Sequence, residues 1–251
     1  MIFFIVPVYN EAENAGGLVE GLSAASASAG EPFRIIAVDD GSTDGSAEAL
    51  EALDAAVEVI RFGANRGIAS VLREGFARAC GLADDDDPLV FIEADCSNDP
   101  GTLSSMLERF RGGADVVSAS RYVKGGKIRG FPPARRAVSR LSNLVLRLLV
   151  PLPAASDYTY FFKMYRARTV KEAFREYGDA FLKTRRFSAN AEFFIKMRRL
   201  TSRYDQVPTR YDYARKGSES KFAPIREVPE YVRLIAVCRA ELRRSRHAAG
   251  L

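Results

Sequence analysis

Histidine is almost missing from this chain of 251 residues: the single one is His247, near the C-terminus. A catalytic triad and a histidine-ligated zinc site both need histidine beside other functional groups, so neither is expected. Cysteine is also scarce, and Cys80, Cys96 and Cys238 are odd in number and lack metal-site spacing. This pattern argues against a disulfide framework and for a reducing compartment, with the cytoplasm as the expected location.

Long hydrophobic runs are missing as well. Met1 leads directly into residues 2–6, a run without a basic segment before it and too short for a signal peptide or a membrane-spanning helix. We expect a first strand there. Neither G-x-x-x-x-G-K-[ST] nor G-x-G-x-x-G occurs in the sequence, so a P-loop and a classical dinucleotide site are not expected.

Acidic residues are absent from positions 116–156, although the net charge of the whole chain is only +5. The basic residues of this block are Arg121, Lys124, Lys127, Arg129, Arg135, Arg136, Arg140 and Arg147. Such a block attracts an anionic partner, and the pattern leaves open nucleic acid, an anionic membrane surface and a phosphorylated substrate. A solvated basic face without function is the remaining alternative.

Apolar runs alternate with helical patterns in the first half of the chain. Runs typical of strands lie at residues 2–8, 33–38, 57–62, 90–95 and 116–120, and helical spacing follows each of the first four. The alternation predicts an α/β fold with a doubly wound, mostly parallel sheet. The length and the apolar content of 47% allow a sizeable core, in one domain or a domain plus a subdomain.

The second half of the chain is less regular. Residues 138–150 form a basic amphipathic pattern, which suits either a core helix or a helix in the membrane interface. We expect an edge strand over residues 158–165 and a further strand over 204–213. Helices are expected over residues 170–177 and 189–200, and a basic helix near the C-terminus.

Acidic side chains follow several of the predicted strands. Glu11 follows the first strand, Asp39 and Asp40 the second, and Glu93 and Asp95 end the fourth. In a doubly wound sheet these strand ends meet at one edge, where ligands bind. Residues 93 and 95 point the same way along an extended backbone, so both carboxylates can meet one hard cation holding a phosphate. The alternative is that one acid caps a turn and the other is solvated.

Four segments resemble the family 2 inverting glycosyltransferases of GT-A fold, in the family's order. They are Val6-Pro7-Val8-Tyr9-Asn10-Glu11, Val38-Asp39-Asp40-Gly41-Ser42-Thr43-Asp44, Asn65-Arg66-Gly67 and Glu93-Ala94-Asp95. The later segments resemble the dolichyl- or polyprenyl-phosphate mannosyltransferase branch: residues 120–126, Arg135-Arg136 with Ser139, Asp157, and residues 215–221. The resemblance implies a GT-A domain over 1–222, with a nucleotide-sugar half (1–115), an acceptor half (116–222) and a basic helical tail (223–251).

The resemblance also implies roles for individual residues. The residues implied to bind the donor are Pro7, Tyr9, Glu11, Asp39, Asp40, Asn65, Gly67, Glu93, Ala94 and Asp95. The residues implied to bind the acceptor phosphate are Arg121, Arg135, Ser139, Arg215 and Lys221. The implied ligands of a divalent metal, Mg²⁺ or Mn²⁺, are Glu93, Asp95 and Ser97. The implied catalytic residues are Asp95, Arg121 and Asp157. The branch usually has aspartate at position 93, glutamine at 97 and a small, Gly-containing segment where residues 158–162 are aromatic.

The implied activity is metal-dependent, inverting transfer of a hexose onto a polyprenyl or dolichyl phosphate. The expected donor is GDP-mannose, and the expected location is the cytoplasmic membrane surface, where the protein binds peripherally. No nucleic-acid partner is expected, because exposed aromatics do not interleave with the basic block. One alternative is a UDP-sugar donor or a saccharide or secondary-metabolite hydroxyl acceptor, with Asp157 as the base. The other is a nucleotide-sugar-binding protein without turnover.

Overall fold

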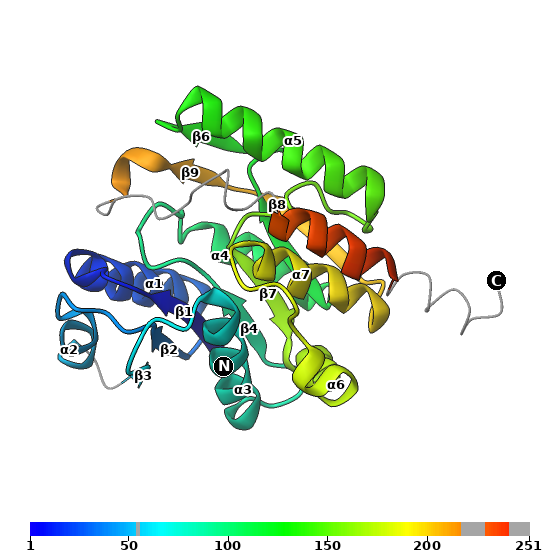
Figure 1. Cartoon of the computed structure of the whole chain (residues 1–251). Coiled ribbons are helices and arrows are strands. Elements are labelled where there is room, and N and C mark those ends of the chain that lie inside the picture. The colour runs from blue at the N-terminus through cyan, green and yellow to red at the C-terminus, as the bar shows by residue number, and fades with distance from the viewer. Residues whose placement is uncertain (54–55, 217–228, 241–251) are drawn as a thin grey trace.

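The computed structural model describes residues 1–53, 56–216 and 229–240, and one central sheet runs through it with helices on both faces (Figure 1). Its seven strands are β1 (Ile2–Val8), β2 (Phe33–Asp39), β3 (Val57–Arg61), β4 (Pro88–Phe91), β5 (Val116–Ser120), β7 (Lys163–Arg166) and β8 (Tyr204–Pro208). Their spatial order is β3-β2-β1-β4-β7-β5-β8. Because β7 alone runs antiparallel to its neighbours in this sheet, the predicted mostly parallel α/β fold is confirmed.

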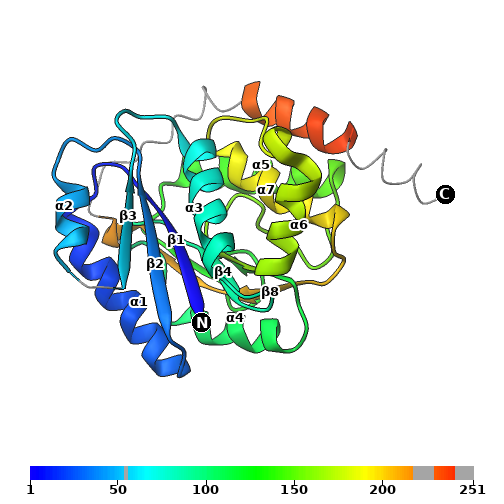
Figure 2. The same ribbon diagram turned by 90° about the horizontal axis from the view of Figure 1, so that it is seen from below.

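Each face of the sheet has its own apolar core, since successive strand residues point to opposite sides. In β1, Phe3 and Ile5 belong to one core and Ile2, Phe4 and Val6 to the other. The first core is covered by α3 (Ile68–Leu82), α6 (Ala167–Tyr177) and α7 (Ser188–Lys196). The second is covered by α1 (Ala15–Ala29), α2 (Ser46–Glu51) and α4 (Thr102–Arg111). Figure 2 shows α1 and α3 on opposite sides of β1 and β2.

A smaller unit lies beside the carboxyl end of the sheet. It consists of the parallel strands β6 (Lys127–Arg129) and β9 (Arg210–Asp212), with α5 (Pro133–Leu149) along it (Figure 1). The 3-10 helices within the described ranges are η1 (Ala12–Asn14), η2 (Gly178–Ala180), η3 (Met197–Arg199) and η4 (Tyr213–Arg215). The helix predicted from residue 138 begins earlier, because Pro133 suits the first turn of a helix.

The prediction of an edge strand over residues 158–165 is wrong. Only residues 163–166 form a strand, β7, and it lies between β4 and β5. Its charged side chains are accommodated inside: Lys163 Nζ donates to the Tyr160 carbonyl, and Arg166 Nε donates to Asp115 Oδ1 at 2.9 Å. The strand predicted over 204–213 is divided into β8 and β9, and β4 ends at Phe91, before the acid pair.

Residues 229–240 are helical, and Leu234 and Cys238 are fully buried in the core that α7 also covers. The division into a domain over 1–222 and a tail over 223–251 stays a prediction, since parts of both ranges lie outside the described residues. None of the described helices is long and apolar enough to cross a membrane.

Candidate active site

A cavity of about 670 Å³ lies where the carboxyl ends of β1, β2 and β4 meet the segments that follow β5 and β9. Its lining includes most of the residues that the sequence analysis selected. They are Pro7, Tyr9, Glu11, Asp40, Asn65, Gly67, Glu93, Ala94, Asp95, Arg121, Arg135 and Ser139. The strand-end carboxylates and the basic residues of the later segment therefore share one cavity.

The loops after β1 and β2 are hydrogen-bonded to each other. Asn10 Oδ1 accepts a hydrogen bond from the Thr43 N–H at 2.9 Å, and the Asn10 N–H donates to Ser42 Oγ at 2.9 Å. The Glu11 N–H donates to Ser46 Oγ at 2.8 Å. These bonds hold the loop that carries Tyr9 and Glu11 at the cavity.

Asp39 and Asp40 are adjacent but differ in placement. The Asp40 carboxylate lines the cavity and accepts hydrogen bonds from the N–H groups of Arg66 at 2.6 Å and Gly67 at 3.0 Å. Burial raises its pKa, although these two N–H groups oppose the shift. The Asp39 carboxylate accepts from the Ser42 N–H at 3.3 Å and does not line the cavity. Its contact with the nucleotide stays a prediction.

Glu93 and Asp95 both line the cavity, as does Ala94 between them, and all three lie beyond the end of β4. Burial, with a smaller contribution from the Asp95 carboxylate, raises the pKa of Glu93 to about 8. Asp95 is 3% exposed. Its Oδ2 accepts from Lys216 Nζ at 2.6 Å, and its Oδ1 accepts from the Ser97 N–H at 3.1 Å. Both carboxylate oxygens of Asp95 are thus hydrogen-bonded within the chain.

Two of the three predicted metal ligands suit a hard cation, because Glu93 and Asp95 present carboxylate oxygens to the cavity. Ser97 does not fit this role. Its hydroxyl donates to Asp95 Oδ1, its side chain is 1% exposed, and it does not line the cavity. Within the described part of the chain, no group of three or more His, Cys, Asp or Glu side chains is arranged to hold a metal ion.

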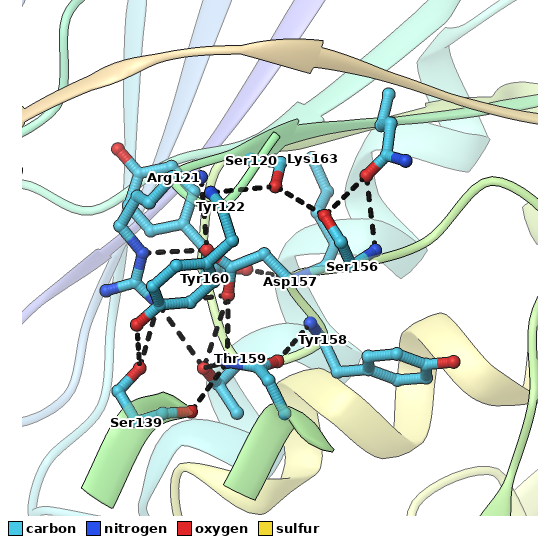
Figure 3. Close-up of polar contacts among 12 residues, drawn as sticks. Ser120, Arg121, Tyr122, Ser139, Ser156, Asp157, Tyr158, Thr159, Tyr160 and Lys163 are labelled. Atoms are coloured by element: carbon cyan, nitrogen blue, oxygen red, sulfur yellow. Dashed lines mark hydrogen bonds and ion pairs between the residues drawn. The ribbon is translucent and has the colours of Figure 1, made fainter. Parts of the chain in front are cut away.

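Arg121 follows β5, and Asp157 holds its guanidinium (Figure 3). Nε donates to Asp157 Oδ2 at 2.7 Å and Nη2 donates to Oδ1 at 2.9 Å. Burial favours the neutral form of Asp157, but the charge and the hydrogen bonds of Arg121, with the charge of Lys163, together outweigh it and hold the pKa of Asp157 below its usual range. Arg121 lines the cavity, whereas the fully buried Asp157 lies behind it. This placement favours a positioning role for Asp157 over that of a base.

Arg135 and Ser139 reach the cavity from α5. Ser139 Oγ accepts from Tyr122 Oη at 2.8 Å and from Arg121 Nη2 at 3.3 Å (Figure 3). Arg135 Nη1 donates to Tyr213 Oη at 2.9 Å. Three of the predicted phosphate-binding residues therefore lie around one cavity. Of the other two, Arg215 is exposed and does not line it, and Lys221 lies outside the described residues.

Several lining residues were not predicted from the sequence, among them Arg66, Phe131, Thr159, Tyr160, Arg185, Arg186, Tyr211, Tyr213 and Lys216. The signal for Arg185 and Arg186 was a pair of arginines before a predicted helix. Their loop is held by the buried Glu192, whose Oε2 accepts from the Thr184 N–H at 2.8 Å. Lys216 lies within the segment that carried the resemblance, yet it received no role.

Tyr160 is the most informative of the missed residues. Its side chain lines the cavity and is 2% exposed, and its ring lies 4.7 Å from the Arg121 guanidinium carbon. Its hydroxyl has no hydrogen-bond partner among the described residues. A buried hydroxyl without a partner is unfavourable, and this one belongs to a residue of the cavity wall.

Residues 3–174 match the family model described as Glycosyl transferase family 2. The chain is 34% identical over 149 residues to the dolichol-phosphate mannosyltransferase of Pyrococcus furiosus, covering 59% of this chain and 40% of that protein. It is 33% identical over 175 residues to the undecaprenyl-phosphate 4-deoxy-4-formamido-L-arabinose transferase of Pectobacterium atrosepticum, covering 68% of this chain and 50% of that protein. The alignments thus span half or less of each relative.

Among solved structures, glucosyl-3-phosphoglycerate synthase from Mycobacterium tuberculosis, in complex with Mn²⁺, UDP and phosphoglyceric acid, has a similar fold. The TM-score is 0.66 at 15% sequence identity, and the match covers 95% of this chain and 76% of that one. At this identity the likeness shows the fold alone, and it confirms the predicted GT-A fold.

Proposed function

Because the chain belongs to glycosyl transferase family 2, we propose that it moves a hexose from a nucleoside diphosphate sugar onto a polyprenyl phosphate, with inversion. The observation that carries the proposal is the shared cavity, which is lined both by Glu93 and Asp95 and by Arg121 and Arg135. Mannose from GDP-mannose is the first candidate, because one relative is a dolichol-phosphate mannosyltransferase. The relative that transfers 4-deoxy-4-formamido-L-arabinose makes a different sugar the main alternative.

On the donor side, the hydrogen-bonded loops that carry Tyr9, Glu11 and Asp40 would hold the nucleotide. Glu93 and Asp95 would hold Mg²⁺ or Mn²⁺, and the solved glucosyl-3-phosphoglycerate synthase of similar fold contains Mn²⁺ together with UDP. A cation bound there neutralises charge on the departing nucleoside diphosphate.

On the acceptor side, Arg121, Arg135 and Ser139 would bind the phosphate of the lipid. Arginine pairs with phosphate through two hydrogen bonds in a fixed geometry, and here Asp157 keeps Arg121 in one orientation. The oxygen of a phosphate monoester is already anionic at neutral pH, so no strong base is required. The scarcity of histidine and the buried position of Asp157 agree with such an acceptor.

The outer face of α5 fits a lipid surface. Leu141, Leu144 and Leu148 follow one another at helical spacing and are 62%, 51% and 72% exposed. Arg140 and Arg147 are exposed beside them. A helix with such a face lies in the interface of an anionic membrane, so we propose peripheral association with the cytoplasmic membrane surface. Because α5 also supplies cavity residues, a lipid phosphate can reach the site from the surface on which the helix rests.

The test is a panel of labelled GDP- and UDP-sugars incubated with polyprenyl phosphate and Mg²⁺ or Mn²⁺, scored for label that partitions into organic solvent. Label from one donor identifies the sugar and supports the proposal. Hydrolysis of the donor without lipid label would favour another acceptor, such as a saccharide hydroxyl. Donor binding without any turnover would indicate a nucleotide-sugar-binding protein.

A further inference from the structure

Lys216 lies at the carboxylate that the proposed function assigns to the cation. Its Nζ is 2.6 Å from Asp95 Oδ2, and the two side chains are 15% and 4% exposed. An ion pair this far from solvent is poorly screened by salt, unlike a surface pair. The contact therefore competes with any other positive charge for the same oxygen.

The backbone places Lys216 where it is. It follows β9 and η4, and this segment runs beside the loop after β4: the Asp212 N–H donates to the Ser97 carbonyl at 3.0 Å, and Tyr211 bridges to Asn98. Asp212 also accepts from the Ala214 N–H at 3.1 Å, which orders the turn before Lys216. The lysine is thus fixed to the loop whose carboxylate it contacts.

The ammonium of Lys216 lies at one oxygen of the Asp95 carboxylate, Oδ2. Since the other oxygen of Asp95 accepts from Ser97, the ammonium occupies the side of Asp95 that no other described residue hydrogen-bonds. A divalent cation that binds Asp95 Oδ2 must therefore take the place of this ammonium.

We propose that Lys216 is a built-in competitor of the divalent cation, which must displace the Lys216 ammonium from Asp95 Oδ2 before it can bind. The inference rests on the proposed assignment of the cation to Asp95. A released Lys216 stays on the cavity wall, where its charge faces the diphosphate of a bound donor. Lys216 therefore sets the cation concentration at which the site fills.

The experiment is a titration of the purified chain with Mn²⁺ alone, followed by the electron paramagnetic resonance signal of free Mn²⁺. We expect the Kd of Lys216→Met to be about tenfold lower than that of the unmodified chain, because one poorly screened repulsion is removed. Lys216→Arg keeps the charge and should not bind Mn²⁺ more tightly. Lys124→Met removes an exposed lysine that does not line the cavity and is the matched control for net charge. In the Asp95→Asn background, Lys216→Met should no longer tighten binding.

An unchanged or higher Kd for Lys216→Met would overturn the inference, as would an equal effect of Lys124→Met or no Mn²⁺ binding by any variant. The titration contains no sugar donor and no lipid, so its result is separate from the test of transfer. Tighter Mn²⁺ binding by Lys216→Met without lipid label from any donor would leave the inference standing and contradict the proposed transfer. Lipid label together with an unchanged Kd for Lys216→Met would support the proposed transfer and contradict the inference about Lys216.

Discussion

Arg121 and Asp157 form a buried, two-pronged ion pair, with Nε donating to Oδ2 at 2.7 Å and Nη2 donating to Oδ1 at 2.9 Å. Asp157→Asn keeps the shape of the side chain but leaves the guanidinium without its counter-charge. We expect a loss of about 3 kcal/mol in the free energy of unfolding, the usual effect of breaking a buried pair. Urea denaturation measures it.

The same variant separates positioning from base catalysis. If Asp157 positions Arg121, Asp157→Asn raises the KM for polyprenyl phosphate more than it lowers kcat, because phosphate binding depends on the orientation of Arg121. A fall in kcat alone, with the acceptor KM unchanged, would instead indicate that Asp157 takes a proton. Steady-state kinetics with varied acceptor distinguishes these results.

Tyr160→Phe removes a buried hydroxyl that has no hydrogen-bond partner among the described residues. Its removal should leave the melting temperature unchanged or slightly higher, since nothing in the protein loses a bond. If the hydroxyl meets a bound substrate, kcat/KM falls about tenfold, the effect of one hydrogen bond. Unchanged kinetics would show that the hydroxyl contacts neither donor nor acceptor.

Lys163 is fully buried on β7, and burial lowers the pKa of its ammonium from 10.5 to about 7. Between these two values the unfolded chain binds more protons than the folded one at this lysine, so rising pH favours folding there. The stability of the unmodified chain relative to Lys163→Met should therefore rise with pH across this window, by at most about 1.4 kcal/mol per pH unit. Urea unfolding at several pH values checks this; a constant difference between the two proteins would contradict it.

Leu141→Ser with Leu148→Ser removes two of the exposed leucines of α5. Because burying one leucine contributes about 1.5 to 3 kcal/mol, binding to anionic vesicles should fall by tenfold or more. Leu53→Ser changes an exposed leucine in the first half of the chain and should leave co-sedimentation intact. An equal loss of vesicle binding in the double variant and in Leu53→Ser would show that α5 does not contact the membrane. Co-sedimentation should also weaken with salt, since the exposed arginines contribute.

The alternation of apolar runs was sufficient to predict the parallel part of the sheet, since β1, β2 and β4 are buried on both faces. The sequence could not predict that β7 is inserted between β4 and β5. Lys163 and Arg166 look unsuited to a sheet interior, and the groups that accommodate them, such as Asp115, lie far away in the chain.

In the candidate site, too, local features are predictable from the sequence and contacts between distant segments are not. Glu93 and Asp95 come directly after β4, whose position is predictable from a local apolar run, and this brings both to the cavity. The pairing of Asp157 with Arg121 spans 36 positions and that of Lys216 with Asp95 spans 121, and both depend on how distant loops pack. Sequence patterns gave the residue types of the site, whereas tertiary packing decides which side chain faces the cavity.

We propose that this cavity transfers sugar to a lipid phosphate. The most direct measurement supplies the donor identified in the panel with two acceptors that differ only in the phosphate group, a polyprenyl phosphate and the corresponding polyprenol. The account predicts lipid label with the phosphate and none with the alcohol, because Arg121 and Arg135 need an anion to bind and Asp157 lies behind Arg121. Equal label on the polyprenol, or none on the phosphate, would contradict it.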